Sequence, residues 1–185
     1  MTTYDRSLVT QVNTEEPSKH WGFIRCKDEI VLDLGCGRWE HVEYRDQSWP
    51  TTPEYLIQLG ASKVYAIDID STEVLWYLTN ITPKLPVYPQ SKAIHSANDV
   101  RELLLAYKPT VIKCDIEGAE TTLLSLTDDE FRSIRFYAIE AHSENIFNGF
   151  MEKFNQLNYK IVSIVELTHA HPMKVIFAER NDSNA

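Results

Sequence analysis

The stretch Ile30-Val31-Leu32-Asp33-Leu34-Gly35-Cys36-Gly37 decides the fold. Its first five residues are apolar apart from Asp33, and two glycines follow. A short apolar run of this kind indicates a buried strand of a parallel sheet, and the glycines indicate a tight turn at its carboxyl end. Because glycine has no Cβ, such a turn also lets the backbone pass close to a ligand. We therefore expect a ligand-binding unit to begin at this strand.

Segments typical of strands and of helices alternate through the rest of the chain. After the strand at 30–34, we expect strands over residues 63–68, 92–96, 110–115, 134–141, 159–167 and 174–179. Helices are expected between them, over 53–59, 72–80, 98–107, 120–126 and 143–157. The connection 168–172 is too short for a crossover helix, so the last two strands form an antiparallel hairpin. The pattern predicts an α/β fold: a doubly wound, Rossmann-like sheet of seven strands in which the seventh runs antiparallel.

Length and charge limit the domain organisation and the partners. The chain has 185 residues, 18 of them basic and 27 acidic, and a formal net charge of −9. This length suits one domain, so we divide the chain into an N-terminal arm or short helix (1–28), one α/β domain (29–180) and a disordered tail (181–185). A surface that binds nucleic acid needs clustered Lys and Arg, and a membrane span needs a long apolar run. Neither occurs, so we expect no nucleic acid and no membrane among the partners.

The cysteines indicate the compartment. Cys26, Cys36 and Cys114 make an odd set without paired spacing, which favours free thiols in a reducing environment. The N-terminus has no basic start followed by an apolar stretch, so no signal peptide is expected. The sequence therefore predicts a cytoplasmic protein.

Polar side chains stand at the carboxyl ends of the predicted strands, the edge where doubly wound sheets bind ligands. These residues are Asp33, Asp68, Ser96, Asp115, Glu140 and His142. The hairpin loop with His169 and His171 is expected at the same edge. Glu140 and His142 are two apart on a strand and therefore face the same side.

The residues after the first strand argue against a dinucleotide. The pattern G-x-G-x-x-G has Glu40 at its third glycine position, and a carboxylate there would repel a pyrophosphate. The next helix begins only near Pro53, too late to place its positive end under the turn. A nucleoside with a cationic group suits this acidic lining better, because Asp68 can accept hydrogen bonds from ribose hydroxyls. An NAD-dependent dehydrogenase stays as the less favoured alternative.

Two motifs carry a family resemblance. Val31–Gly37 followed by Val64–Asp68 resembles the nucleotide-binding half of class I S-adenosylmethionine-dependent methyltransferases. Ile112-Lys113-Cys114-Asp115-Ile116-Glu117-Gly118-Ala119-Glu120 resembles the K-x-D-x-E-G-x-E signature of the FkbM-type methyltransferases. Ile139–His142 also resembles that family's next strand, which carries an E-x-H element. The resemblance extends from about Ile30 to Glu179.

The resemblance implies the sheet order 3-2-1-4-5-7-6 and S-adenosyl-L-methionine as the cofactor, above strands one and two. It places Gly35 and Gly37 under the methionine and ribose, Asp68 on the ribose, and Asn98 and Asp99 near adenine. The cofactor-binding candidates are Asp33, Leu34, Gly35, Cys36, Gly37, Asp68, Ile69, Asn98, Asp99 and Asp115.

Methyl transfer to a hydroxyl requires removal of its proton. The catalytic candidates are Asp115, Glu117, Glu140 and His142. We expect His142 to act as the general base, with Glu140 or Asp115 fixing its tautomer, although it could instead cap the following helix. Glu120 is interpreted as an acid that stabilises the start of a helix.

A divalent cation on Asp115, Glu140 and His142, completed by His169 or His171, is an alternative that we rate below a metal-free site. The favoured function is O-methylation of a small molecule or sugar hydroxyl. Methylation of nitrogen or of a protein stays open, as does a non-catalytic, cofactor-binding partner subunit, and a homo-oligomer is compatible with the sequence. The segment 38–50 is expected to cover the cofactor or recognise the substrate.

Overall fold

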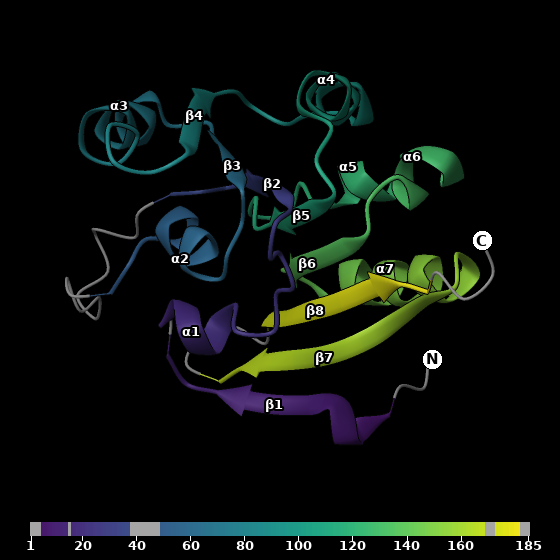
Figure 1. Cartoon of the computed structure of the whole chain (residues 1–185). Coiled ribbons are helices and arrows are strands. Elements are labelled where there is room, and N and C mark those ends of the chain that lie inside the picture. Colours follow the sequence, from purple (N-terminus) through teal and green to yellow (C-terminus); the bar gives the residue numbers. More distant parts are fainter. Residues whose placement is uncertain (1–4, 15, 38–48, 169–172, 182–185) are drawn as a thin grey trace.

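One mixed sheet forms the centre of the molecule (Figure 1). The computed structural model describes residues 5–14, 16–37, 49–168 and 173–181. Eight strands lie in the order β1-β7-β8-β6-β5-β2-β3-β4. The strands are β1 (Val9–Val12), β2 (Ile30–Leu34), β3 (Lys63–Asp68), β4 (Val87–Ser91), β5 (Val111–Cys114), β6 (Phe136–Ala141), β7 (Tyr159–Leu167) and β8 (Met173–Arg180). Only β8 runs antiparallel to its neighbours.

The predicted fold class and strand order are confirmed, with eight strands in place of seven. The order β4-β3-β2-β5-β6-β8-β7 is the predicted 3-2-1-4-5-7-6. The additional strand is β1, which pairs parallel with β7 and lies within the segment expected to be an arm or a short helix. Of its four residues only Val12 is buried. Such a strand lacks the apolar run or alternation by which strands are recognised in a sequence.

Helices cover both faces of the sheet (Figure 1). On one face lie α1 (Pro17–His20), α2 (Thr52–Gln58) and α3 (Ser71–Asn80). On the other lie α4 (Ala97–Tyr107), α5 (Thr121–Leu124), α6 (Asp128–Arg132) and α7 (Glu144–Gln156). A 3-10 turn, Arg6–Leu8, precedes β1. Among the described residues, no helix has the length and apolar character needed to cross a membrane.

The position of β4 corrects the predicted third strand. A strand was expected over 92–96, but the chain pairs with β3 at Val87–Ser91. Pro89, which would interrupt a helix, lies inside β4. Because β4 is an edge strand, one side of its backbone needs no sheet partner, and a residue without an N–H is tolerated there.

The alternation of side chains along the central strands positions the site. In β2, β5 and β6, the residues Leu32, Ile112 and Tyr137 pack against the helices α4–α7. Their neighbours along each strand face α1–α3, and among these are charged residues that are almost completely buried: Asp33, Lys113 and Glu140. Strand positions of this kind are normally apolar. Buried charges at these positions therefore indicate a functional site on the face of the sheet that α1 covers.

Candidate functional site

A buried ion pair supports the turn that follows β2. The Lys113 ammonium lies 3.1 Å from Asp33 Oδ1 and donates a hydrogen bond of 2.6 Å to the carbonyl of Gly35. It also lies 4.8 Å from the centre of the Trp21 ring, just after α1. Lys113 thereby ties the glycine turn to β5 and to the covering helix.

The charges of this pair depend on each other. Burial raises the pKa of Asp33 to about 6, although Lys113 opposes the change. Burial works against the charge of Lys113, but the carboxylates of Asp33 and Asp115 raise the pKa of Lys113 above its ordinary value. Lys113 is therefore a permanent cation in the fold, and Asp33 is its counter-ion.

Gly35 brings the turn into direct contact with the end of β5. Its φ is +75°, and a Cβ added there would lie 1.6 Å from the carbonyl oxygen of Asp115. The amide of Asp115 in turn donates to the carbonyl of Leu34 at 2.9 Å. The predicted cofactor turn and the first predicted catalytic residue are thus adjacent.

Asp68 and Ile69 lie beside this turn, at the end of β3. The Asp68 carboxylate is half-buried and accepts hydrogen bonds from the amides of Asp70, at 2.9 Å, and Gly37. Burial raises the pKa of Asp68 above its ordinary value. Ile69 is 70% exposed. A fixed carboxylate and an accessible apolar side chain therefore stand together next to the glycines.

Other predicted cofactor residues have different surroundings. Asp33, Leu34 and Cys36 are completely buried, so their side chains are not exposed to a ligand at the surface. Asp99 accepts from the amides of His95 and Ser96, at 3.1 and 2.9 Å, and closes the cap of α4. Asn98 is exposed and accepts a hydrogen bond from Arg101 at 2.7 Å. The structure does not bring Asn98 and Asp99 into contact with the glycine turn, and contacts with adenine there remain a prediction.

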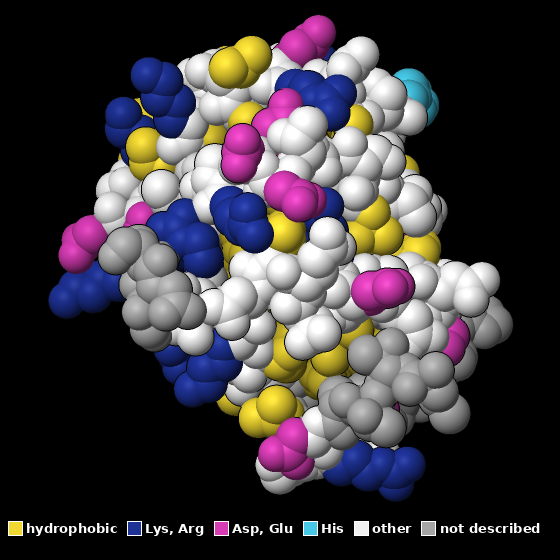
Figure 2. All heavy atoms as spheres, turned by 90° about the vertical axis from the view of Figure 1, so that its right-hand side faces the viewer, with side chains coloured by type: hydrophobic (Ala, Val, Ile, Leu, Met, Phe, Trp, Pro, Cys, Tyr) yellow, Lys and Arg dark blue, Asp and Glu magenta, His cyan; other side chains and the backbone are white. Residues whose placement is uncertain are grey.

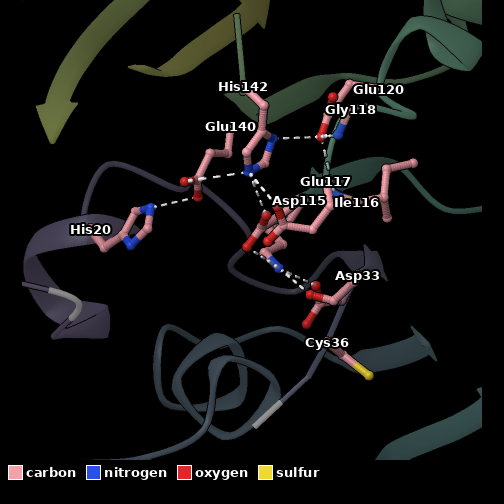
Figure 3. A network of polar contacts seen from close by, with 12 residues as sticks. His20, Asp33, Cys36, Asp115, Ile116, Glu117, Gly118, Glu120, Glu140 and His142 are labelled. Atoms are coloured by element: carbon pink, nitrogen blue, oxygen red, sulfur yellow. Dashed lines mark hydrogen bonds and ion pairs between the residues drawn. The ribbon is translucent and has the colours of Figure 1, made fainter. Parts of the chain in front are cut away.

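The four predicted catalytic residues meet around His142 (Figure 3). Nε2 of His142 lies 3.6 Å from Asp115 Oδ1, 3.5 Å from Glu117 Oε2 and 3.9 Å from Glu140 Oε1. Its other nitrogen, Nδ1, lies 2.8 Å from Glu120 Oε1. Ser143, not His142, caps α7. The imidazole is therefore held by one carboxylate and faces three others.

Glu120 orients this imidazole, a role that the sequence analysis missed. Its side chain is completely buried, and Oε1 accepts from the amides of Gly118 and Ile116 at 3.0 and 3.2 Å. The turn that presents these amides has positive φ at Glu117 and Gly118, +52° and +97°. The last glutamate of the K-x-D-x-E-G-x-E motif was the available signal.

The environment shifts the pKa of three members of this cluster, Asp115, Glu120 and His142. Burial works to lower the pKa of His142, but the hydrogen bond and charge of Glu120 raise it to about 9. Burial and the carboxylate of Glu140 raise the pKa of Asp115 to about 7. Burial acts to raise the pKa of Glu120, but the hydrogen bonds from His142 and the Gly118 amide hold it below its ordinary value.

His20 is a second residue that the sequence analysis did not find. It ends α1, and its Nε2 lies 2.9 Å from Glu140 Oε2, with both side chains 4% exposed. Its ring stacks on Trp21, with centroids 4.4 Å apart and planes 6° apart. No motif connects His20 to Glu140, because they lie 120 positions apart in the chain and only the tertiary fold brings them together.

One donor set suited to a metal lies in this cluster. Asp115, Glu140 and His142 each offer a ligand atom, and these atoms lie within 4.8 Å of one another. His169 and His171, proposed to complete such a set, lie outside the described residues, as does most of the segment 38–50.

Comparisons with known proteins give structural similarity only. No protein-family model matches the sequence, and no curated protein matches it either. A protein of the NADB-Rossmann superfamily from Streptococcus agalactiae is similar over 97% of this chain and 73% of its own, with a TM-score of 0.61 and 14% identity. The fibrillarin pre-rRNA processing protein of Methanococcus jannaschii is similar over 84% of this chain and 67% of its own, with a TM-score of 0.58 and 17% identity.

A third similar structure contains S-adenosyl-L-methionine. It is a protein assigned as a tRNA (m1A22) methyltransferase, from Streptococcus pneumoniae. The similarity covers 94% of this chain and 76% of that protein, with a TM-score of 0.60 and 11% identity.

The expectation that nucleic acid is not among the partners is wrong in the light of these structures. Two of them are named for tRNA and pre-rRNA. The net charge of −9 is a sum over the chain and does not describe any one face. Figure 2 shows Lys and Arg side chains interspersed with Asp and Glu side chains over one side of the molecule. The comparisons establish the fold: this chain has a Rossmann-like α/β architecture, which it shares with these structures.

Proposed function

We propose that this protein is an S-adenosylmethionine-dependent methyltransferase that methylates a hydroxyl oxygen. The observation that carries the proposal is the contact between the Gly35 turn and Asp115. Asp115 is also a member of the cluster of acidic side chains around His142. The turn expected to bind the cofactor therefore lies next to carboxylates that can accept a proton. The signature from Lys113 to Glu120 supports the narrower assignment to the FkbM type.

The residues beside the turn fit this cofactor. The Asp68 carboxylate is fixed by two amides and can accept from ribose hydroxyls, while Ile69 offers apolar surface for a base. The acidic surroundings suit a positively charged sulfonium. When bound, S-adenosyl-L-methionine supplies a methyl group made electrophilic by that charged sulfur.

The chain's own residues would orient the acceptor and take its proton. Asp115 and Glu140 can accept a hydrogen bond from a hydroxyl and receive its proton. The pKa of His142 is raised to about 9, so its imidazole is already protonated at neutral pH and acts as a hydrogen-bond donor in this cluster. Glu120 fixes the ring of His142, and His20 fixes the carboxylate of Glu140. Such fixed geometry is what aligns a nucleophile for an in-line displacement.

Two kinds of acceptor follow from different observations. The acidic cluster favours the hydroxyl of a small molecule or sugar, because a phosphate beside three carboxylates would be repelled. The similarity to proteins named for tRNA and pre-rRNA supports an RNA acceptor as the second candidate.

A transfer assay with a labelled methyl group tests the proposal. Labelled S-adenosylmethionine is supplied with a panel of sugars and small hydroxylated molecules and, separately, with total RNA. We expect label in the first pool, and a loss of at least about a hundredfold in rate for Asp115→Asn. Asp129→Asn, which removes an exposed carboxylate on α6, should leave the rate unchanged. Label in neither pool would contradict an enzymatic role and favour a non-catalytic cofactor-binding subunit.

A further inference from the structure

We propose that Asp115, Glu140 and His142 bind a divalent cation of the manganese or magnesium class, which holds the acceptor hydroxyl. The catalytic part of this inference rests on the proposed methyl transfer, whereas cation binding does not depend on it. The inference reverses the preference for a metal-free site that the sequence alone suggested. The geometry of the four acidic residues around the imidazole supports it.

The distances around Nε2 of His142 are too long for hydrogen bonds and suit a shared cation. The three carboxylate oxygens that it faces lie 3.5–3.9 Å away, whereas an N–H···O bond measures about 2.9 Å. Octahedral ligands at about 2.1 Å from a small cation lie about 3 Å apart when adjacent and about 4.2 Å when opposite. The ligand atoms of Asp115, Glu140 and His142 all lie within 4.8 Å of one another. Small rotations of these side chains would bring them to coordination distance.

An unsatisfied oxygen gives independent support. The Asp115 side chain is only 7% exposed, and its Oδ1 atom has no hydrogen-bond partner among the described residues. Leaving a buried carboxylate oxygen without a partner is costly, so such an atom calls for an explanation such as an ion. Figure 3 shows this carboxylate pointing toward Glu140 and the ring of His142. A cation between them would satisfy it.

The tautomer of His142 also fits metal binding. Glu120 occupies Nδ1, and two backbone amides fix Glu120 in turn. Nε2 is therefore the nitrogen left for a ligand, and a carboxylate behind a coordinating histidine is the usual arrangement at metal sites. On the other side, His20 holds the second oxygen of Glu140. Glu140 and His142 thus each have a close partner that sets their orientation, and the Lys113 ammonium lies 3.8 Å from Oδ2 of Asp115.

The balance of charge favours a hard cation. Five carboxylates (Asp33, Asp115, Glu117, Glu120 and Glu140) lie in the cluster with one lysine and two histidines. Even two protonated imidazoles would leave an excess of negative charge. Carboxylate ligands with a single imidazole suit manganese or magnesium better than metals that prefer thiolates.

A cation in this position would act on the acceptor. A hydroxyl bound to a divalent cation loses its proton more readily, and the cation also fixes the direction of its lone pair. Glu117, whose side chain is 66% exposed, lies at the open side of the cluster and can pass the proton to solvent.

Manganese titration followed by electron paramagnetic resonance tests the site, because free Mn²⁺ gives a signal that protein binding removes. After dialysis against EDTA, the full chain should bind one Mn²⁺, with Mg²⁺ competing. Asp115→Asn and Glu140→Gln should each weaken binding by at least about tenfold, and Glu120→Gln by about ten- to a hundredfold. Asp129→Asn is the charge-matched control, and circular dichroism checks that each variant folds.

The outcomes separate this site from the proposed function. Mn²⁺ that stays free with the wild-type chain would overturn the cation site, as would unchanged binding by folded Glu140→Gln and Glu120→Gln. Titration with S-adenosylmethionine in EDTA tests the cofactor alone. Cofactor binding without Mn²⁺ binding would remove only the cation site, and Mn²⁺ binding without cofactor binding would remove only the methyltransferase proposal.

Discussion

At the scale of single residues, the site depends on close approaches that few side chains permit. Gly35 lies against the Asp115 carbonyl, Lys113 fills a buried position between two carboxylates, and Glu120 reaches His142 through a turn of positive φ. Lys113 places a charge where a buried strand would normally have an apolar side chain, and Gly35 and Glu120 lie in turns at the ends of strands β2 and β5. A substitution at one of these positions should therefore have a predictable effect on the free energy of unfolding.

Gly35→Ala should destabilise the protein by about 3 kcal/mol or more. The added Cβ would lie 1.6 Å from a backbone oxygen, and the φ of +75° is itself unfavourable for alanine. Gly118→Ala is the matched control: φ is +97°, but a Cβ there has no atom within 4 Å. It should cost only the backbone strain, about 1–2 kcal/mol. Urea unfolding measures both, and equal losses would contradict the steric account.

Lys113→Met should destabilise the fold by about 3–5 kcal/mol at neutral pH, because it leaves the buried Asp33 carboxylate without its counter-ion. The pKa of Asp33 is already raised to about 6 by burial and should rise further in this variant. A raised folded pKa contributes stability at acid pH that is lost as the pH rises through it. The variant should therefore lose more stability than the wild type between pH 5 and pH 8.

The double variant Asp33→Asn with Lys113→Met is the control for this charge effect. It removes the titrating carboxylate together with its partner, so the extra pH dependence should disappear. Denaturant unfolding at several pH values makes the comparison. If the free energy of unfolding depended on pH as steeply in the double variant as in Lys113→Met, a group other than Asp33 would be responsible for the pH dependence.

At the scale of elements, the short helix α1 covers the site and contributes to it. It supplies His20 to Glu140, and the following Trp21 lies over Lys113. Its four residues and the preceding β1 carry little sequence signal. The long elements with a clear sequence pattern form the sheet and its main helices, whereas the short helix α1 covers the site.

His20→Gln should lower the rate of methyl transfer by about tenfold and leave the affinity for S-adenosylmethionine within about twofold. The reason is that His20 holds Glu140 and lies on a different element from Asp68. Steady-state kinetics together with cofactor titration separate the two effects. Lys19→Gln, at the exposed neighbouring position, serves as the control. A variant that lost cofactor affinity and kept its rate would contradict this role.

At the scale of the whole molecule, the two cores on either side of the sheet leave the thiols inaccessible. Cys26, Cys36 and Cys114 are free and buried. Burial raises the pKa of Cys26 to about 11 and the pKa of Cys36 and Cys114 well above the ordinary value. We expect no reaction with Ellman's reagent in the native state and three thiols after unfolding. A thiol that reacts rapidly in the folded protein would show that its part of the core opens.

The sequence predicted the sheet because its central strands are apolar runs whose ends are marked by Gly, Asp and His. The run at 30–34 and its glycines lie where expected, and the strand order is the predicted one. The third strand was predicted at the edge of the sheet but over 92–96, because a proline such as Pro89 is uncommon inside a strand. His20 was missed because only tertiary packing brings it to Glu140. Glu120 was interpreted as an acid at the start of a helix, although it is the last glutamate of the K-x-D-x-E-G-x-E motif.

Calorimetric titration of the purified chain with S-adenosyl-L-methionine tests the central claim most directly. We predict binding of one molecule per chain, and an affinity reduced by at least about tenfold in Asp68→Ala, which removes the carboxylate beside the glycine turn. Asp129→Ala should bind like the wild type. Absence of binding by the folded wild-type chain, or full affinity in Asp68→Ala, would contradict the account.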